Sequence, residues 1–138
     1  MIRHMGSGAQ RSILVVDDDA DIRETLSMIL EDEGYTVACA SNGREALTYL
    51  RELCARGDNP PPNLILLDLM MPVMDGAEFC LHQRQDPRLA EIPVVIVTAS
   101  GQAKEHASAL HAKAFIYKPL ALDTLLEKVE QCCSAPRP

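Results

Sequence analysis

The sequence lacks any apolar run close to the roughly 20 residues that a membrane-spanning helix requires. It also has no low-complexity stretch of the kind that stays disordered. These two absences exclude a membrane span and a disordered chain. With 138 residues, of which 24% are charged and 47% hydrophobic, the composition is typical of a single globular domain. We therefore expect one soluble domain with one core.

Clusters of basic residues are also absent. The chain has 13 Lys and Arg against 20 Asp and Glu, a net charge of −7 and an isoelectric point near 5.0. A nucleic-acid-binding surface needs clustered lysine and arginine to neutralise phosphates, so we expect no direct binding to nucleic acid. An acidic chain whose carboxylates gather in one place is better suited to hold a divalent cation.

The cysteines show no metal-site spacing, and no charged-then-apolar leader opens the chain. Their odd number indicates reduced thiols and a cytoplasmic location. The five cysteines are Cys39, Cys54, Cys80, Cys132 and Cys133.

The first ten residues, MIRHMGSGAQ, contain His-Met-Gly-Ser and show no periodicity. We interpret residues 1–10 as a remnant of an expression tag. Residues 11–133 then form the predicted domain, and residues 134–138 are expected to be a tail or a truncated linker.

Five short apolar runs predict the strands of a parallel sheet. The run from Leu64 to Leu67 lies between the turn-forming segment NPPPN and Pro72, and it ends at Asp68. A run that is apolar at every position is typical of a strand buried on both faces. Each of the other runs also ends at a polar residue. The five runs are Ser12–Val16, Thr36–Ala40, Leu64–Leu67, Pro93–Val97 and Ala114–Tyr117.

The segments between these runs have the apolar spacing of amphipathic helices. In the first, Leu26 and Leu30 share a face, and Gly34 follows where a helix is expected to end. In the last, Leu122 is the first residue of the apolar face. The alanine-rich segment 102–113 has few large apolar residues and shows the weakest pattern. The predicted helices lie within residues 19–34, 43–57, 76–85, 102–113 and 122–133.

Five strands that alternate with five helices predict an α/β fold, a doubly wound parallel sheet with helices on both faces. Right-handed crossovers bring the carboxyl ends of parallel strands to one edge of the sheet. Ligands bind at that edge in open α/β folds. The polar residues expected there are Asp17, Asp18, Asp19, Asp68, Thr98 and Lys118.

Carboxylates brought together from two strand ends repel one another and raise each other's pKa unless a cation lies among them. A small set of oxygen ligands suits Mg²⁺, which is the predicted cofactor. A simpler interpretation of Asp17-Asp18-Asp19 is a helix N-terminus, where acidic residues favour the helix dipole. Asp19 or Asp21 fits that simpler role.

Thr98 and Lys118 supply what a phosphoryl group on a carboxylate needs, a hydroxyl donor and a positive charge. Taken singly, Thr98 is an ordinary hydroxyl at a strand end and Lys118 an ordinary loop residue. Their occurrence together with Asp68 at separate strand ends favours a site for an aspartyl phosphate.

These features resemble the response-regulator receiver domain of two-component phosphorelay signalling, over Ser12 to Cys133. The matching segments are ILVVDDD, ASNGREAL, LLDLMMPVMDG, IPVVIVTAS and YKPL. Each segment is weak evidence alone, and the combination is highly specific. The resemblance implies a flavodoxin-like sheet with strand order 2-1-3-4-5.

The resemblance also implies roles for individual residues. Asp68 corresponds to the phosphoacceptor. Asp18 corresponds to a direct Mg²⁺ ligand, Asp17 to a carboxylate that holds the metal partly through water, and the backbone carbonyl of Met70 to a further ligand.

Three more positions match the family's switch. Thr98 matches its hydroxyl and Lys118 its phosphate-binding lysine. Phe115 falls at the aromatic switch position, and because a phenylalanine has no hydroxyl, we expect this switch to work by packing alone.

By resemblance, Asp68 takes a phosphoryl group from a phosphohistidine of a histidine kinase or a histidine phosphotransfer protein. Water then hydrolyses the acyl phosphate, so we expect weak autophosphatase activity in place of conventional turnover. An output domain or partner protein is implied, at a face formed by the fourth helix, fifth strand and fifth helix.

Three alternative functions compete with this interpretation. A histidine phosphotransfer module is a helical bundle, and the five strands argue against it. A phosphatase with a nucleophilic aspartate needs an acid two residues later, where this chain has Met70. A receiver-like module that binds partners without phosphorylation stays open.

Overall fold

Strands and helices alternate along the described part of this computed structural model, which comprises residues 11–57, 60–99 and 112–134. The elements are β1 (Ser12–Val16), α1 (Ala20–Asp32), β2 (Thr36–Ala40), α2 (Gly43–Arg56), β3 (Leu64–Asp68), α3 (Gly76–Gln85), β4 (Val94–Thr98), β5 (Ala114–Tyr117) and α5 (Leu122–Ser134).

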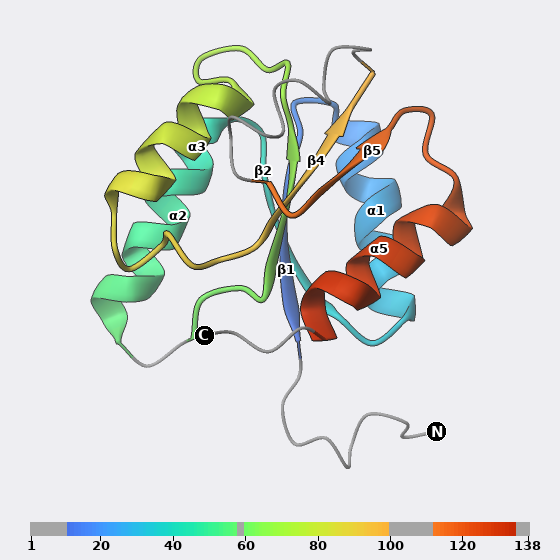
Figure 1. Cartoon of the computed structure of the whole chain (residues 1–138), viewed down its shortest axis with the longest axis horizontal. Helices are drawn as coiled ribbons and strands as arrows, with labels where there is room; N and C mark the ends of the chain where they lie inside the picture. Colours follow the sequence, from blue (N-terminus) through green and yellow to red (C-terminus); the bar gives the residue numbers. More distant parts are fainter. Residues whose placement is uncertain (1–10, 58–59, 100–111, 135–138) are drawn as a thin grey trace.

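The five strands form one sheet in the order β2-β1-β3-β4-β5, and every neighbouring pair is parallel. Figure 1 shows α2 and α3 against one face of the sheet and α1 and α5 against the other. The predicted doubly wound α/β fold and its strand order are therefore confirmed. In the register, Val16 pairs with Leu67 and Asp68 pairs with Val97, which brings the carboxyl ends of β1, β3 and β4 together.

The predicted strand bounds agree with the structure to within one residue. β3 extends through Asp68, and β4 begins at Val94, one residue later than predicted. Pro93 has no N–H to donate to the sheet, although its carbonyl accepts a 2.9 Å hydrogen bond from the amide of Ile65.

The described residues contain four of the five predicted helices. Most of the remaining one, residues 102–111, lies outside the described residues, and its last two positions, Ala112 and Lys113, are not helical.

The sheet separates two apolar cores, one on each face, where the sequence predicts one. This arrangement explains the uninterrupted apolar run of β3. Ile65 and Leu67 pack toward α2 and α3, whereas Leu64 and Leu66 pack toward α1 and α5. All five residues of β3 are buried.

Leu122 was expected on the core face of its helix, and that prediction is wrong. It is the first residue of α5, and its side chain is 51% exposed. Among the described residues, no helix has both the length and the apolar character needed to cross a bilayer.

Caps fix where three helices begin. Asp19 caps α1 by accepting hydrogen bonds from the amides of Asp21 and Ile22, so the helix-terminus role considered for Asp19 is confirmed. Asn42 caps α2 and Asp75 caps α3 in the same manner. All three helices thus start at the edge of the sheet where the carboxyl ends of the strands meet.

Candidate functional site

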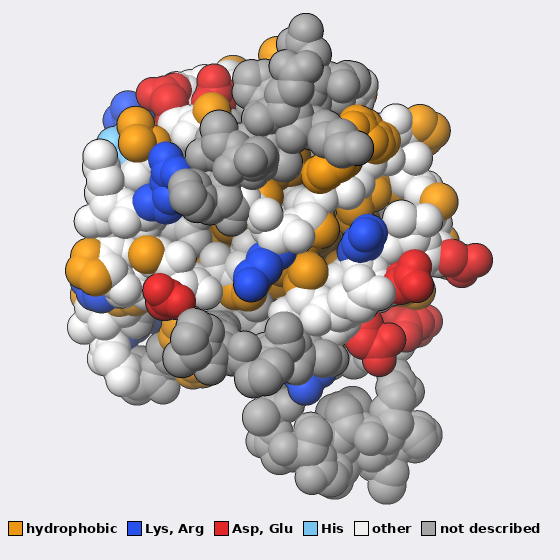
Figure 2. Space-filling model, in the orientation of Figure 1, with side chains coloured by type: hydrophobic (Ala, Val, Ile, Leu, Met, Phe, Trp, Pro, Cys, Tyr) orange, Lys and Arg blue, Asp and Glu red, His pale blue; other side chains and the backbone are white. Residues whose placement is uncertain are grey.

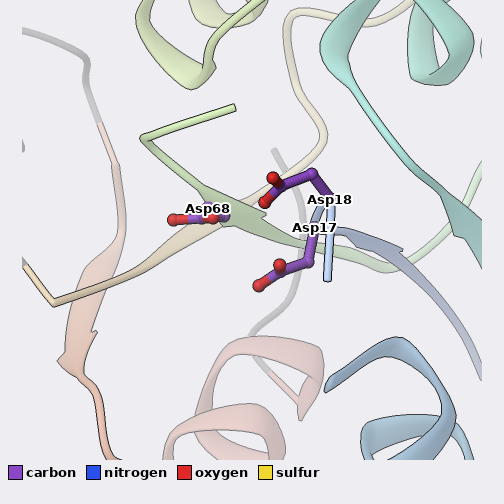
Figure 3. Close-up of side chains that lie close together, drawn as sticks. All are labelled: Asp17, Asp18 and Asp68. Atoms are coloured by element: carbon purple, nitrogen blue, oxygen red, sulfur yellow. The ribbon is translucent and has the colours of Figure 1, made fainter. Parts of the chain in front are cut away.

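Three aspartates lie together at the carboxyl edge of the sheet. One carboxylate oxygen from each of Asp17, Asp18 and Asp68 lies within 4.8 Å of the others. Figure 3 shows that these side chains come from the ends of β1 and β3 and lie close together. Asp17 and Asp68 are only 3% and 5% exposed, and Asp18 is exposed. The structure therefore brings together the three carboxylates that the sequence predicts.

Lys118 joins this cluster from the end of β5. Its Nζ donates a 2.9 Å hydrogen bond to Oδ2 of Asp17 and lies 3.5 Å from Oδ2 of Asp68. Burial alone lowers the pKa of Lys118. The hydrogen bond to Asp17 and the charge of Asp68 outweigh burial, so the pKa of Lys118 is raised. The lysine is therefore held in its charged form.

The surroundings of Asp68 disfavour its ionised form. Burial raises the pKa of Asp68, the charge of Asp17 raises it further, and Lys118 only partly opposes these effects. The formal charges of three carboxylates and one lysine sum to −2, in a site where two of the carboxylates are shielded from water. A cation with a preference for carboxylate oxygens fits this donor set.

The loop after β3 shapes the space around Asp68. The amide of Met70 donates to Oδ1 of Asp68 over 3.3 Å, while the Met70 side chain is 73% exposed. Gly76 packs so tightly that a Cβ there would lie 2.7 Å from the backbone oxygen of Asp68. The assignment of the Met70 carbonyl as a metal ligand stays a prediction.

Thr98 ends β4 beside this cluster and is fully buried. Its carbonyl accepts a 2.9 Å hydrogen bond from the amide of Lys118, which links the two residues at neighbouring strand ends. The position of Thr98 agrees with its predicted place at the site edge, and its role as a switch stays a prediction.

Phe115 lies on β5 outside the carboxylate cluster. It pairs with Ile96, two positions before Thr98 in the β4–β5 register, and it is half-buried against the core on the α2 and α3 side. Its ring meets that of Tyr117 edge to face, with centroids 5.4 Å apart. Phe115 therefore contacts both the apolar core and an aromatic neighbour that is itself exposed.

One residue at the site was not anticipated from the sequence. Arg23, on α1, donates a 2.8 Å hydrogen bond from Nη1 to the backbone oxygen of Asp17. The contact depends on how the chain turns between β1 and α1, so the sequence position of Arg23 did not indicate it.

Comparisons with known proteins agree with this geometry. The family profile described as "Response regulator receiver domain" matches residues 13–130. An uncharacterised 14.6 kDa protein of Leptolyngbya boryana is 38% identical over 130 residues, which cover 92% of this chain and 93% of that protein.

Longer proteins match as well. The DNA-binding response regulator MtrA of Mycobacterium tuberculosis is 37% identical over 122 residues, 87% of this chain and 49% of MtrA. This chain thus spans about half the length of that relative. A crystal structure of the response regulator TrrA of Thermotoga maritima, in complex with Mg(2+)-BeF, superposes with a TM-score of 0.74 at 32% identity and covers 89% of this chain and 99% of TrrA.

Proposed function

The chain belongs to the response regulator receiver domain family, and from this premise we propose that it is a phosphoryl-accepting switch with Asp68 as the acceptor. The observation that carries the proposal is the placement of Lys118 between Asp17 and Asp68, beside a third carboxylate. That set combines a nucleophile, a cation for phosphoryl oxygens and ligands for a metal.

Asp17, Asp18 and Asp68 would hold Mg²⁺, with the Met70 carbonyl as a further ligand. When bound, Mg²⁺ supplies positive charge to the phosphoryl oxygens and offsets the repulsion among the carboxylates. The donor set fits this ion because it is small, made only of oxygen and negatively charged. The complex of TrrA with Mg(2+)-BeF supports the same choice.

The proposed reaction is transfer from a phosphohistidine of a histidine kinase or a phosphotransfer protein. A carboxylate oxygen of Asp68 attacks phosphorus as the phosphorus–nitrogen bond breaks, and the electron pair and a proton stay with the departing imidazole. Lys118 neutralises the phosphoryl oxygens, and the hydroxyl of Thr98 donates a hydrogen bond to one of them. Water later attacks phosphorus, which releases phosphate and restores Asp68.

Phosphorylation would change the packing at β4 and β5. Thr98 is fully buried next to the site, so a shift of its hydroxyl toward a phosphoryl group changes the space around Phe115. The half-buried ring of Phe115 can then leave its contact with Tyr117 and move into that space. The fraction of molecules in which the Phe115 ring points inward then depends on whether Asp68 is phosphorylated.

A groove beside the site offers a place for the phosphohistidine donor. It has a volume of about 220 Å³ between α1 and the start of α5, and Ile22, Leu26 and Leu120 are among the apolar residues that line it. Asp21 lines this groove and Asp123 lies in the first turn of α5, and Figure 2 shows red side chains at the right of the view, over α5 and the end of α1. The occupant that we propose is a helix of the donor protein with an apolar stripe and basic flanks.

The test is a set of amide nuclear magnetic resonance spectra of the chain with Mg²⁺, with and without beryllofluoride, a mimic of the phosphoryl group. We expect beryllofluoride to shift the amides near Asp68, Thr98 and Phe115 in the wild-type chain and not in Asp68→Asn. Spectra that beryllofluoride leaves unchanged, from a folded wild-type chain, would favour the phosphorylation-independent binding module instead.

A further inference from the structure

Asp17 is fixed by hydrogen bonds at every polar atom that it has. Its amide donates to the carbonyl of Ala40 over 3.1 Å, and its Oδ1 accepts from the amide of Asp19 over 2.9 Å. Its Oδ2 accepts from Lys118, and its backbone oxygen accepts from Arg23. Four residues therefore hold Asp17 in place, two through its carboxylate and two through its backbone.

The contact from Arg23 differs from the other three because it is made by a side chain to the backbone of Asp17. Nη1 of Arg23 reaches back from the first turns of α1 to the residue that follows β1, and the contact is partly buried. A buried carbonyl gains from a charged donor, and this one restrains the backbone from which the Asp17 side chain leaves.

We propose that Arg23 is a positioning residue for the metal site, which fixes Asp17 so that its carboxylate shares one space with Asp18 and Asp68. This inference rests on the proposed function. Mg²⁺ demands nearly ideal octahedral geometry at about 2.0–2.1 Å, so a small displacement of one ligand weakens binding. Residues that orient metal ligands typically change affinity by about 10-fold to 100-fold when they are replaced.

Electrostatics alone predicts the opposite change in Mg²⁺ affinity when Arg23 is replaced. Arg23 is a positive charge near a cation site, and its removal without any loss of geometry would tighten Mg²⁺ binding. The direction of the change in Mg²⁺ affinity therefore separates a positioning role from a simple counter-charge.

The experiment is a calorimetric titration of the full chain with Mg²⁺ for the wild type, Arg23→Gln, Arg23→Lys and the control Arg44→Gln. Arg44→Gln removes the same charge from an exposed residue in the first turn of α2. We expect the Mg²⁺ dissociation constant to rise about tenfold in Arg23→Gln. A smaller rise is expected in Arg23→Lys, whose side chain keeps the charge but is shorter, and no rise in the control.

A second readout separates positioning from general damage. The rate of phosphorylation by a small-molecule phosphodonor should fall in Arg23→Gln at low Mg²⁺ and approach the wild-type rate at saturating Mg²⁺. If Arg23→Gln does not fold, Arg23→Lys decides, because a pure counter-charge role predicts wild-type affinity for that variant.

Unchanged or tighter Mg²⁺ binding in folded Arg23→Gln would overturn the positioning role. A wild-type chain that fails to bind Mg²⁺ would overturn the proposed function instead, so the two failures are distinguishable.

Discussion

Lys118 and Asp17, 101 residues apart in sequence, form a hydrogen-bonded ion pair with 2.9 Å between Nζ and Oδ2. The proposed phosphate-binding lysine thus contacts a proposed metal ligand directly. Lys118 and a bound Mg²⁺ would compete for the same carboxylate, so a change at Lys118 should affect metal binding and phosphoryl transfer in opposite directions.

Lys118→Met tests this competition. We expect Mg²⁺ affinity to rise several-fold, because a competing positive charge is removed, and phosphorylation at saturating Mg²⁺ to slow by more than tenfold. Without metal, the variant should lose about 2 kcal/mol of unfolding free energy, because Asp17 keeps a buried charge without its partner. Calorimetry, adduct formation and urea denaturation measure the three effects.

The pH dependence of that stability loss follows from the raised pKa of Lys118. A lysine whose folded-state pKa is raised stabilises the fold fully below its ordinary pKa of 10.5 and loses the effect as the pH rises through the folded-state value. The difference between wild type and Lys118→Met should therefore be constant through the neutral range. A difference that disappears on moderate alkalinisation, well below that pKa, would contradict this account.

Asp68→Asn should stabilise the metal-free chain at pH 7. The pKa of Asp68 is raised above 3.8 by burial and by Asp17, so ionised Asp68 destabilises the fold. This destabilisation develops as the pH rises from 3.8 through the folded-state pKa and is complete above it. The advantage of asparagine should shrink on acidification and should reverse with Mg²⁺, which stabilises the wild type by binding. Denaturation curves at neutral and acidic pH, with and without Mg²⁺, check each sign.

Much of the fold was predictable because the apolar pattern is strong. Every residue of β3 and β4 is buried, so both strands stand out as continuous apolar runs, and their ends mark the site. Alternating strands and helices then define a parallel sheet, and its edge assembles Asp17, Asp68 and Lys118.

The details of the site were less predictable from the sequence. The hydrogen bond from Arg23 to Asp17 depends on the three-dimensional path between β1 and α1, which no residue spacing encodes. Leu122 is exposed because it is the first residue of α5, where the apolar periodicity of the helix no longer determines which residues are buried. Val73 has a left-handed backbone, which β-branched residues disfavour. The local sequence therefore predicts a negative φ at this position.

Val73→Gly should stabilise the chain. Val73 has a φ of 71° in the loop between β3 and α3, and its side chain is 69% exposed, so little packing compensates for the strain. Replacement by glycine should raise the unfolding free energy by about 1 kcal/mol. Val73→Ala is the matched control, because it keeps a Cβ at the same backbone angle and should gain less. Equal stabilities for the glycine and alanine variants would argue against backbone strain.

Gly76→Ala should damage both the fold and the site. Its Cβ would lie 2.7 Å from the backbone oxygen of Asp68 and 2.9 Å from Cα of Leu69, so the end of β3 must move. We expect a loss of about 2 kcal/mol in unfolding free energy. Slower phosphorylation at saturating Mg²⁺ should accompany it.

The same substitution elsewhere provides the control for Gly76. Gly57→Ala acts at a φ of 75° with no atom within 4 Å of the new Cβ, so it should cost about 1 kcal/mol through the backbone alone. Its phosphorylation rate should equal that of the wild type. A similar slowing in Gly57→Ala would show that lost stability, and not displacement of Asp68, causes the effect.

Intact-mass spectrometry after incubation with a small-molecule phosphodonor and Mg²⁺ tests the central claim most directly. The account predicts one phosphoryl adduct on the wild-type chain, and no adduct on Asp68→Ala or in the presence of a chelator. No adduct on the folded wild-type chain, or an adduct that persists in Asp68→Ala, would contradict the assignment of Asp68 as a metal-dependent phosphoacceptor.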